Sequence, residues 1–328
     1  MKILDHKLRI IPLGIHIDPT RPVDKAIITH AHADHARPGN KKVLATKETI
    51  EIMKLRYGNN CAGSFQVLKY SEKIHIDGVS ITLYPAGHIL GSSQVLLEKS
   101  GYKTLITGDY KTIFDQTNTP FELVKCDTLI TEATFGLPIF EHPNSNLEIK
   151  KLISSIISNK DRCHLVGVYS LGKAQRVINL LRENGYTDTI YIHSSLQKIC
   201  QFYQENGVNL GRLKKTVDEK NINFSGKIIL CPPSALRDRW SRRFKNKILS
   251  QASGWMAIKQ RVKQSLIEVP LIISDHSDWN ELTNTIKETG AENIWVTHGR
   301  EDGLVYWCKS IGLNAQPLSI QGREEEDN

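Results

Sequence analysis

Several features of other protein classes are missing from this 328-residue sequence. No segment approaches the ~18 consecutive apolar residues of a transmembrane helix. The amino terminus, Met1 to Lys7, has no continuous apolar core of the kind found in a signal peptide. The six cysteines show no C-x-x-C spacing, which argues against both a disulfide framework and a cysteine zinc cluster. We therefore expect a cytoplasmic protein, without membrane association, whose cysteines are core residues.

The composition is that of a soluble globular protein, with 40% hydrophobic and 24% charged residues. The length suffices for one large or two ordinary domains. The net charge of +8 favours a polyanionic partner such as nucleic acid, although many soluble enzymes are mildly basic.

The most informative segment is the hexapeptide 30–35, His-Ala-His-Ala-Asp-His, because it holds four strong metal ligands. It follows the apolar run 26–29, which predicts a buried strand. His30 and His32 have period-2 spacing and would project from the same side of extended chain. We expect Asp34 and His35 to follow where the chain turns into a helix, so that one segment supplies two metal sites. Imidazole and carboxylate ligands suit zinc, with manganese or iron as alternatives. The competing interpretation is a solvated histidine-rich loop.

Four further ligand-type residues end apolar runs: Asp18, His88, Asp109 and His298. Glycines adjoin three of them, and glycine permits close backbone approach beside a metal. Taken singly, a Gly-Asp after a strand is usually a turn and a His-Gly is usually a loop. Together with the hexapeptide, the four residues complete two coordination shells.

The pattern of predicted helices and strands changes near residue 136. Before this point we predict one helix, 47–57, and several short strands: 64–70, 79–84, 94–98, 104–107 and 128–131. Many short strands with few helices indicate a sandwich. After this point, helices at 147–158, 173–183 and 196–206 alternate with strands at 163–168 and 189–193, as in a parallel α/β unit. Strands near 271–273 and 293–296 then run into ligand-type residues again. We predict one discontinuous domain, 1–137 and 266–322, with a second domain, 138–265, inserted in it and a disordered tail, 323–328.

The ordered motifs resemble those of the metallo-β-lactamase superfamily, which carries H-x-H-x-D-H, then a single His, then an Asp. Three more segments resemble the extra motifs of its β-CASP nuclease branch: 131–136 with Glu132, 274–278 with His276, and 296–299 with His298. Segments 253–256, 275–279 and 296–299 also resemble bacterial DNA-ligase-associated exonucleases. The resemblance implies an α/β fold: a metallo-β-lactamase αββα sandwich with an inserted β-CASP parallel α/β domain.

The resemblance also implies a role for each motif residue. A first zinc ion would be bound by His30, His32 and His88. A second would be bound by Asp34, His35 and His298. Asp109 would bridge the two ions. Mn²⁺ is an alternative to Zn²⁺. Asp18 would orient a ligand imidazole by a hydrogen bond.

Catalytic roles are expected for Asp34, His276 and Glu132. A phosphodiester has a poor alkoxide leaving group, so His276 is the candidate general acid, held charged and oriented by Glu132. The alternatives are a helix-start histidine without chemistry and an ordinary buried carboxylate in an ion pair.

Two segments of the predicted inserted domain could hold phosphates. Ser170, Gly172 and Lys173 lie between a strand and a helix, where a helix amino terminus offers an anion site. The run 237–247 carries six cations, interleaved with aromatic residues that could stack on unpaired bases. We expect nucleic-acid contacts from Arg237, Arg239, Trp240, Arg242 and Arg243, and from nearby Ser234. The alternative is a solvated basic face.

These features predict a metal-dependent nuclease, with single-stranded DNA favoured over RNA and exonucleolytic DNA repair or end processing as its context. A functional link to a DNA ligase or helicase is expected. The competing hypotheses are an RNA-processing nuclease of the 3′-end-processing or RNase J type, an acyl or thioester hydrolase, and a non-enzymatic nucleic-acid-binding partner. An inserted domain, His276 and the basic run argue against small acyl substrates.

Overall fold

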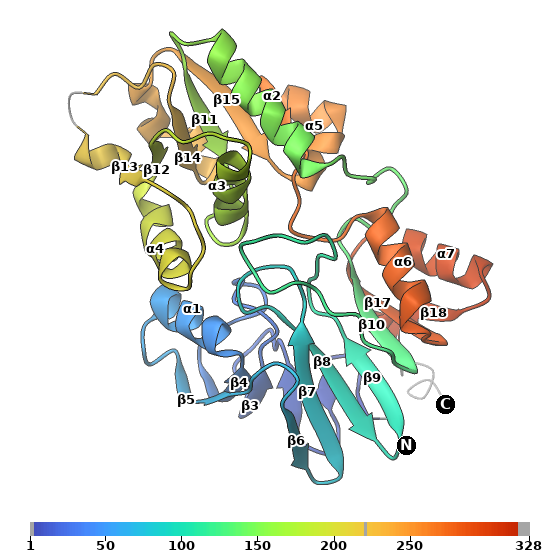
Figure 1. The fold of residues 1–328 in the computed structure, drawn as a ribbon. Helices are drawn as coiled ribbons and strands as arrows, with labels where there is room; N and C mark the ends of the chain where they lie inside the picture. Colours follow the sequence, from blue (N-terminus) through green and yellow to red (C-terminus); the bar gives the residue numbers. More distant parts are fainter. Residues whose placement is uncertain (1–2, 220–221, 321–328) are drawn as a thin grey trace. The chain divides into compact units, whose positions relative to one another are not determined.

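A computed structural model describes residues 3–219 and 222–320, which form two compact units (Figure 1). Unit 1 comprises Met1–Phe140 and His276–Asn328, and unit 2 comprises Glu141–Asp275. The predicted boundaries differ from these bounds. Residues 138–140 belong to unit 1, where the carbonyl of Phe140 accepts a hydrogen bond from the backbone N–H of Trp279. Residues 266–275 belong to unit 2 because they include its edge strand β16. The predicted disordered tail, 323–328, lies outside the described residues.

Unit 1 contains two sheets. The first has five strands in the order β1-β2-β3-β4-β5: β1 (Arg9–Ile10), β2 (Ile15–Ile17), β3 (Lys25–Ile27), β4 (Asn40–Ala45) and β5 (Ala62–Val67). The second has seven strands in the order β18-β17-β10-β9-β8-β7-β6: β6 (Lys73–Ile76), β7 (Val79–Pro85), β8 (Ser93–Lys99), β9 (Tyr102–Ile106), β10 (Thr128–Ala133), β17 (Asn293–Gly299) and β18 (Asn314–Pro317). The second sheet is mixed, because β6 to β9 pair antiparallel while β9, β10, β17 and β18 pair parallel.

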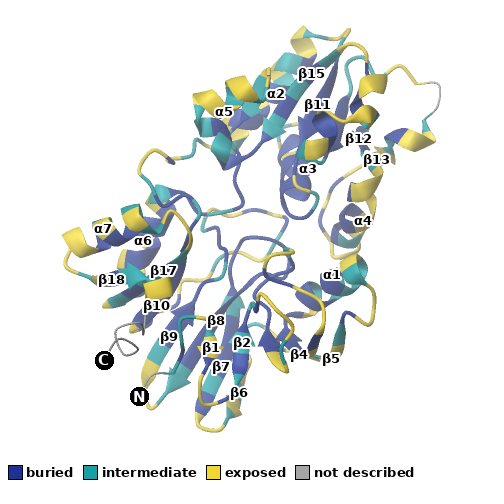
Figure 2. Cartoon of the chain, turned by 180° about the vertical axis from the view of Figure 1, so that it is seen from behind, coloured by how far each residue is buried: buried dark blue, intermediate teal, exposed yellow. Residues whose placement is uncertain are grey.

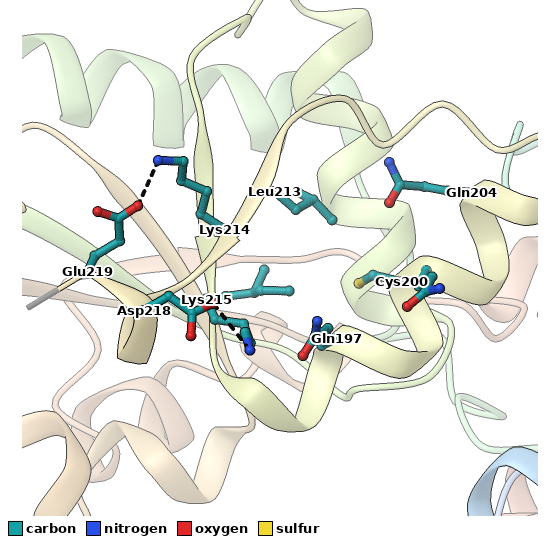
Figure 3. Close-up of a pocket in the computed structure, with 10 residues that line it drawn as sticks. Gln197, Cys200, Gln204, Leu213, Lys214, Lys215, Asp218 and Glu219 are labelled. Atoms are coloured by element: carbon teal, nitrogen blue, oxygen red, sulfur yellow. Dashed lines mark hydrogen bonds and ion pairs between the residues drawn. The ribbon is translucent and has the colours of Figure 1, made fainter.

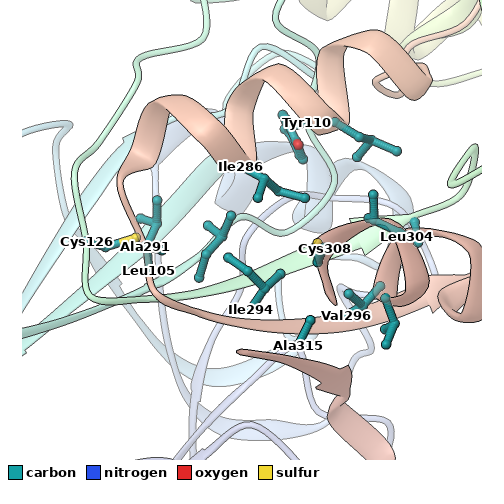
Figure 4. Packing of buried hydrophobic residues seen from close by; sticks show 14 of the residues in the cluster. Leu105, Tyr110, Cys126, Ile286, Ala291, Ile294, Val296, Leu304, Cys308 and Ala315 are labelled. Carbon is teal, nitrogen blue, oxygen red and sulfur yellow. The ribbon is translucent and has the colours of Figure 1, made fainter. Parts of the chain in front are cut away.

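Three apolar clusters show how unit 1 is layered. One cluster joins the facing sides of the two sheets, with Ile27 and Leu44 from the first sheet against Ile81 and Val95 from the second. Helix α1 (Lys47–Tyr57) covers the outer side of the first sheet through a second cluster. Helices α6 (Trp279–Thr289) and α7 (Glu301–Ser310) cover the second sheet through a third cluster (Figure 4). The layers therefore follow the order helix, sheet, sheet, helix, which is the predicted αββα sandwich.

The covering helices are held by the amphipathic pattern of their sequences. Buried Leu282 and Ile286 face the third cluster from α6, while Asn284 and Lys287 of the same helix are exposed, so Figure 2 shows α6 and α7 with both buried and exposed stripes. The predicted helix 47–57 is confirmed, and its N-cap is Thr46, whose side chain accepts from the backbone N–H of Thr49.

Unit 2 is built on one parallel sheet of six strands in the order β13-β12-β14-β11-β15-β16. Its strands are β11 (Cys163–Gly167), β12 (Ile190–Ile192), β13 (Leu213–Lys215), β14 (Ile228–Cys231), β15 (Lys247–Ala252) and β16 (Val269–Leu271). Its α-helices are α2 (Ser145–Ser158), α3 (Lys173–Glu183), α4 (Gln197–Glu205) and α5 (Lys259–Gln264). The strand expected near 271–273 is therefore not part of the sandwich, because β16 pairs in parallel with β15.

Two compositional expectations can be compared with the structure. All six cysteines are buried and none forms a disulfide. None of the helices within the described residues combines the length and apolarity needed to cross a membrane.

Candidate metal centre and active site

The hexapeptide lies just beyond the carboxyl end of β3, at one end of the first sheet. The expected helix at its end is wrong: residues 32–36 form a turn, in which the backbone N–H of Ala36 donates to the carbonyl of His32 over 2.8 Å. Arg56, in the last turn of α1, donates to the carbonyl of Ala31 over 2.5 Å. The turn leaves room for His35 to approach His30, whose ring centroid lies 4.1 Å away.

Four ligand-type side chains converge next to this turn. Nitrogen atoms of His30, His32 and His88 and a carboxylate oxygen of Asp109 all lie within 4.8 Å of one another. The Nε2 atom of His88 is 3.0 Å from Nδ1 of His32, and Nε2 of His30 is 3.5 Å from Oδ2 of Asp109. All but His32 are buried. The structure thus brings together the three histidines expected at the first metal and the aspartate expected to bridge.

Gly108 explains how the Asp109 loop reaches the hexapeptide. Its φ of 56° is in the left-handed region, and a Cβ atom at this position would lie 2.9 Å from the side chain of Thr29. A larger residue would therefore push the loop away from the histidine cluster.

A hydrogen-bond network through Thr29 sets the orientation of two ligand imidazoles. The hydroxyl of Thr29 donates to Oδ2 of Asp18 over 2.5 Å and lies 3.1 Å from Nδ1 of His30. Because its one proton goes to Asp18, this hydroxyl accepts from a protonated Nδ1 of His30, which leaves the lone pair on Nε2. The same Oδ2 atom accepts from Nδ1 of His35 over 2.8 Å. Both rings therefore turn Nε2 toward Asp109.

The protonation state of each ligand-type side chain in the cluster depends on its neighbours. Burial, reinforced by the neighbouring imidazole of His35, holds the pKa of His30 well below its ordinary value. Burial alone would also lower the pKa of His35, but the carboxylates of Asp109 and Asp18 outweigh it and raise the pKa to about 10. Burial opposes ionisation of Asp109, yet the surrounding histidines, His35 foremost, hold its pKa below its usual range. His30 is consequently a neutral imidazole and Asp109 an anion, the states in which both bind metals.

One buried atom tests whether a metal fits here. Within residues 3–219 and 222–320, Nε2 of His30 is a buried nitrogen that makes no hydrogen bond. A buried polar atom without a partner is costly, and a cation bound by its lone pair would remove that cost. Imidazole nitrogens and carboxylate oxygens are the donor set of zinc and related divalent metals. The residues present therefore fit a divalent metal centre.

The other expected ligands lie more loosely around His35. Its Nε2 atom is 3.5 Å from Oδ2 of Asp109 and 3.9 Å from Oδ2 of Asp34, whose side chain is 72% exposed. The ring of His298 lies 4.9 Å from the ring of His35.

His298 reaches this position because of a bulge in β17. Thr297 is opposite Glu132 of β10, and Gly299 is opposite Ala133, so His298 is an extra residue with a φ of 52°. A bulge of this kind redirects a side chain beside a site.

Glu132 and His276 meet at the other side of Asp109. Oε2 of the buried Glu132 lies 2.9 Å from Nδ1 of His276 and accepts from the hydroxyl of Thr134 over 2.6 Å. Its Oε1 atom accepts from the backbone N–H of Tyr110, next to Asp109, over 2.8 Å. The expected pair of carboxylate and histidine is therefore in contact. Nδ1 of His276 is 3.9 Å from Oδ2 of Asp109.

The predicted anion site in unit 2 is not available as expected. Lys173 is 3% exposed, and its Nζ atom donates to Oδ1 of Asp275 over 2.5 Å and to the carbonyl of Ile273 over 3.1 Å. The backbone N–H of Gly172 is bonded to the side chain of Gln175. The expectation that Lys173 and Gly172 face phosphate is wrong, because Asp275 and Ile273 bind the ammonium of Lys173 and Gln175 binds the N–H of Gly172. Ser170, half-buried in the same turn, stays a prediction.

The basic run exposes five of its six cations, while its aromatic rings are half-buried or buried. Arg237, Arg239, Arg242 and Arg243 are exposed, as are Ser234 and Lys245. Trp240 instead packs against His193, with ring centroids 4.8 Å apart, and against the buried Phe244, 5.1 Å away. The guanidinium of Arg243 lies 5.3 Å from the Trp240 ring. Trp240 is half-buried and packs against the apolar cluster of unit 2, and its expected role in stacking on bases stays a prediction.

A surface cavity of about 380 Å³ in unit 2 lies between α4 and β13 (Figure 3). Its charged lining is paired internally, with Lys214 to Glu219 over 2.7 Å and Lys215 to Asp218 over 3.2 Å. The histidine cluster contributes no residue to its lining, so the cavity is separate from the candidate metal centre.

Comparison with known proteins finds relatives that are named as nucleases and as a ligase. No protein-family model matches the chain. It is 25% identical over 96% of its length to a probable DNA ligase of Opitutus terrae, and 30% identical over 56% of its length to the endoribonuclease ysh-1 of Neurospora crassa. It is also 29% identical to an RNase J-like protein of Methanocaldococcus jannaschii, with 85% of this chain and 82% of the relative aligned.

These similarities are consistent with a β-CASP nuclease of the metallo-β-lactamase superfamily. The chain spans 32% of the ligase-named relative and 25% of the ysh-1 protein. A solved structure from Enterococcus faecalis V583, titled as a protein of unknown function, shares the fold with a TM-score of 0.58 and 13% identity, covering 90% of this chain and 79% of that one. Unit 2 lies between the two segments of unit 1 in the sequence, and its assignment as a β-CASP domain stays a prediction.

Sequence reasoning missed three residues that position the site. Thr29 precedes the hexapeptide directly, so its place in the motif was the available signal. Thr134 follows Glu132 by two residues and shares its carboxylate. Arg56 is distant in sequence and gives no local signal.

We predict that Thr29→Val lowers the metal affinity of this site by roughly 10- to 100-fold, as is typical when a residue supporting a ligand is lost. The variant is nearly isosteric but removes the hydroxyl that sets the His30 tautomer. Competition with a calibrated chelator measures the affinity. Thr29→Ser restores the hydroxyl and should stay within a few-fold of the parent protein; equal affinity in all three proteins would show that Thr29 only packs.

Proposed function

We propose that this protein is a dinuclear zinc phosphodiesterase that cleaves nucleic acid, with DNA end processing by an exonuclease as its role. One observation carries the proposal: the convergence of His30, His32, His88 and Asp109 beside the contact between His276 and Glu132. A metal cluster alone fits many hydrolases. A histidine held by a buried carboxylate next to that cluster supplies the proton that an alkoxide leaving group needs.

The residues divide into two groups of metal ligands. One ion would be held by His30, His32 and His88. The other would be held by Asp34, His35 and His298. Asp109 would contribute to both sites. Bound zinc or manganese would lower the pKa of a water molecule and neutralise charge on the phosphate. Asp18 and Thr29 orient the imidazoles, and Glu132 keeps Nδ1 of His276 occupied, so the transferable proton is carried on Nε2.

DNA is favoured over RNA by the extent of the alignments. The relative named as a probable DNA ligase aligns with 96% of this chain, while the ysh-1 endoribonuclease aligns with 56%. We infer a nuclease that acts beside a ligase or helicase. RNA is the second candidate, because the RNase J-like relative aligns over most of both chains.

The exposed cations of unit 2 are the proposed contacts to the nucleic-acid backbone. They are Arg237, Arg239, Arg242 and Lys245, with Ser234 close to them in sequence. Arg243 is also exposed, but its packing on Trp240 gives it a second, structural role.

We predict that the triple variant Arg239→Gln, Arg242→Gln and Lys245→Gln binds single-stranded DNA more weakly and with a flatter salt dependence. Each phosphate contact removed should reduce the slope of log K against log salt by about 0.7 for a single strand. Fluorescence anisotropy across a salt series measures both quantities. As a matched control, replacing exposed Lys25, Lys41 and Lys42 of unit 1 with Gln removes the same charge elsewhere. Equal slopes in the two triple variants would assign the run to a solvated face.

The function itself is tested by a time course on 5′- and 3′-labelled single-stranded and duplex DNA, with RNA of matched sequence. Zinc- and manganese-loaded protein are compared with chelated protein. We expect metal-dependent cleavage of DNA from one end. Preferential cleavage of RNA would support the second candidate, and thioester or lactam turnover without nuclease activity would exclude both.

A further inference from the structure

Three large apolar side chains are exposed on two segments of unit 1 near the start of α6. Ile113 is 59% exposed, Phe114 is 64% exposed and Ile139 is 68% exposed. We call these three residues the α6 rim. Single exposed apolar residues are ordinary, but a contiguous apolar patch marks an interaction site.

A buried carboxylate ties the first segment to α6. Oε1 of Glu281 accepts from the backbone N–H of Ile113 over 3.1 Å and from the hydroxyl of Thr112 over 2.8 Å. Oε2 of the same residue accepts from the backbone N–H of Asp278, the N-cap of α6. Phe114 follows Ile113 directly. The exposed apolar pair is therefore carried by a backbone that hydrogen bonds hold in place.

The second segment reaches the same turn of α6 independently. The carbonyl of Phe140 accepts from the backbone N–H of Trp279, the first residue of α6, over 3.1 Å. The ring of Phe140 packs on Phe135, with centroids 5.1 Å apart. Ile139 precedes Phe140, so its side chain is exposed beside the helix start that also holds Ile113.

The start of α6 is connected to the candidate active site through the chain. His276 precedes Asp278 by two residues, and consecutive Cα atoms are about 3.8 Å apart. On the other side, Phe114 follows Asp109 by only five residues. The backbone N–H of Ser277, next to His276, donates to the carbonyl of Tyr110 over 2.7 Å, so the segment that leads to Phe114 starts beside His276.

We propose that the α6 rim binds an unpaired nucleobase, which stacks on Phe114, in the nucleotide that carries the leaving oxygen. The inference rests on the proposed nuclease function. His276 would protonate the leaving oxygen, so the nucleoside attached to that oxygen lies on the His276 side of the bond. Every base offers an uncharged π face to an aromatic ring, and such stacking tolerates any sequence. A paired base in a duplex could not present that face, so the site selects single-stranded ends.

The test combines one variant with one change in the substrate. Short single-stranded DNA is prepared with all its bases, or with an abasic tetrahydrofuran residue on one or the other side of the cleaved bond. Zinc-loaded parent protein and Phe114→Ala are assayed on each. We expect Phe114→Ala to lower kcat/KM about tenfold on intact DNA, as loss of one stacked base does. The abasic residue on the leaving side should cost the parent a similar factor.

The two losses should not multiply, because both remove the same contact. Phe114→Ala should therefore cleave the abasic substrate as fast as the parent does, and Phe114→Tyr should retain parental rates on intact DNA. Tyr306→Ala, which removes an exposed aromatic of α7, is the matched control and should change neither rate.

Independent, multiplying losses would overturn the proposal, as would parental activity of Phe114→Ala on intact DNA. If that active variant also shifted the oligomeric state in size-exclusion chromatography, the α6 rim would be a contact between copies. If the parent cleaved no nucleic acid at all, the proposed function itself would fail, a result distinct from cleavage that ignores Phe114.

Discussion

Asp109→Ala should have the largest effect of any single substitution: both metals are released and cleavage falls by roughly four orders of magnitude. Asp109 lies 3.5 Å from Nε2 of both His30 and His35, whereas Asp18 is bonded to Nδ1 of His35. Charge stabilisation by bound metals is worth several kcal/mol, and each 1.4 kcal/mol is a factor of ten in rate.

Elemental analysis of the purified variant and a nuclease assay measure the two effects together. Asp115→Asn is the matched control, because Asp115 is a buried aspartate of the same loop that bonds to Thr117. It should retain both metals and most activity. An Asp109→Ala protein with two metals and parental rates would remove Asp109 from the metal centre.

His276→Ala should keep both metals and its affinity for DNA, while turnover falls by roughly two to four orders of magnitude. The reason is the contact of its Nδ1 atom with Oε2 of Glu132, which orients the ring without a metal. A nitrophenyl phosphodiester has a leaving group that needs no proton, so its hydrolysis should be much less affected. Glu132→Gln should show the same selective loss, to a smaller degree.

Metal content, DNA affinity and rates on both substrates are measured for the same preparation. His75→Ala, which removes a histidine bonded to Ser80 on the β6–β7 hairpin, is the control and should leave all four quantities unchanged. Loss of a metal from His276→Ala, or equal rate losses on both substrates, would place His276 among the metal ligands.

Sequence patterns correctly predicted the features that depend on residues close together in the sequence. The helix 47–57 was recognisable from its N-cap threonine and the glycine at its end, and both occupy those positions. The close grouping of His30 and His32 follows from their spacing, and the later ligands from their place after apolar runs.

Errors came where distant segments decide the outcome. Lys173 looked like a phosphate ligand until Asp275, a hundred residues later, supplied its partner. Trp240 packs against His193, a contact that its own segment does not reveal. Likewise, the strand before His276 gave no local sign that its pairing partner is β15. Burial and long-range pairing of this kind cannot be read from a short window of sequence.

The discontinuity of unit 1 has a consequence for the order in which the protein is made. Strand β10 is synthesised before unit 2, and its neighbour β17 only after it. Until then β10 is an open edge, and the apolar surface that α6 and α7 will cover is bare, which exposes a nascent chain to aggregation. His30, His32, His88 and Asp109 can assemble early, but His276 and His298 arrive last. A ribosome-bound chain would therefore complete its histidine and aspartate cluster before it acquires His276, the proposed proton donor.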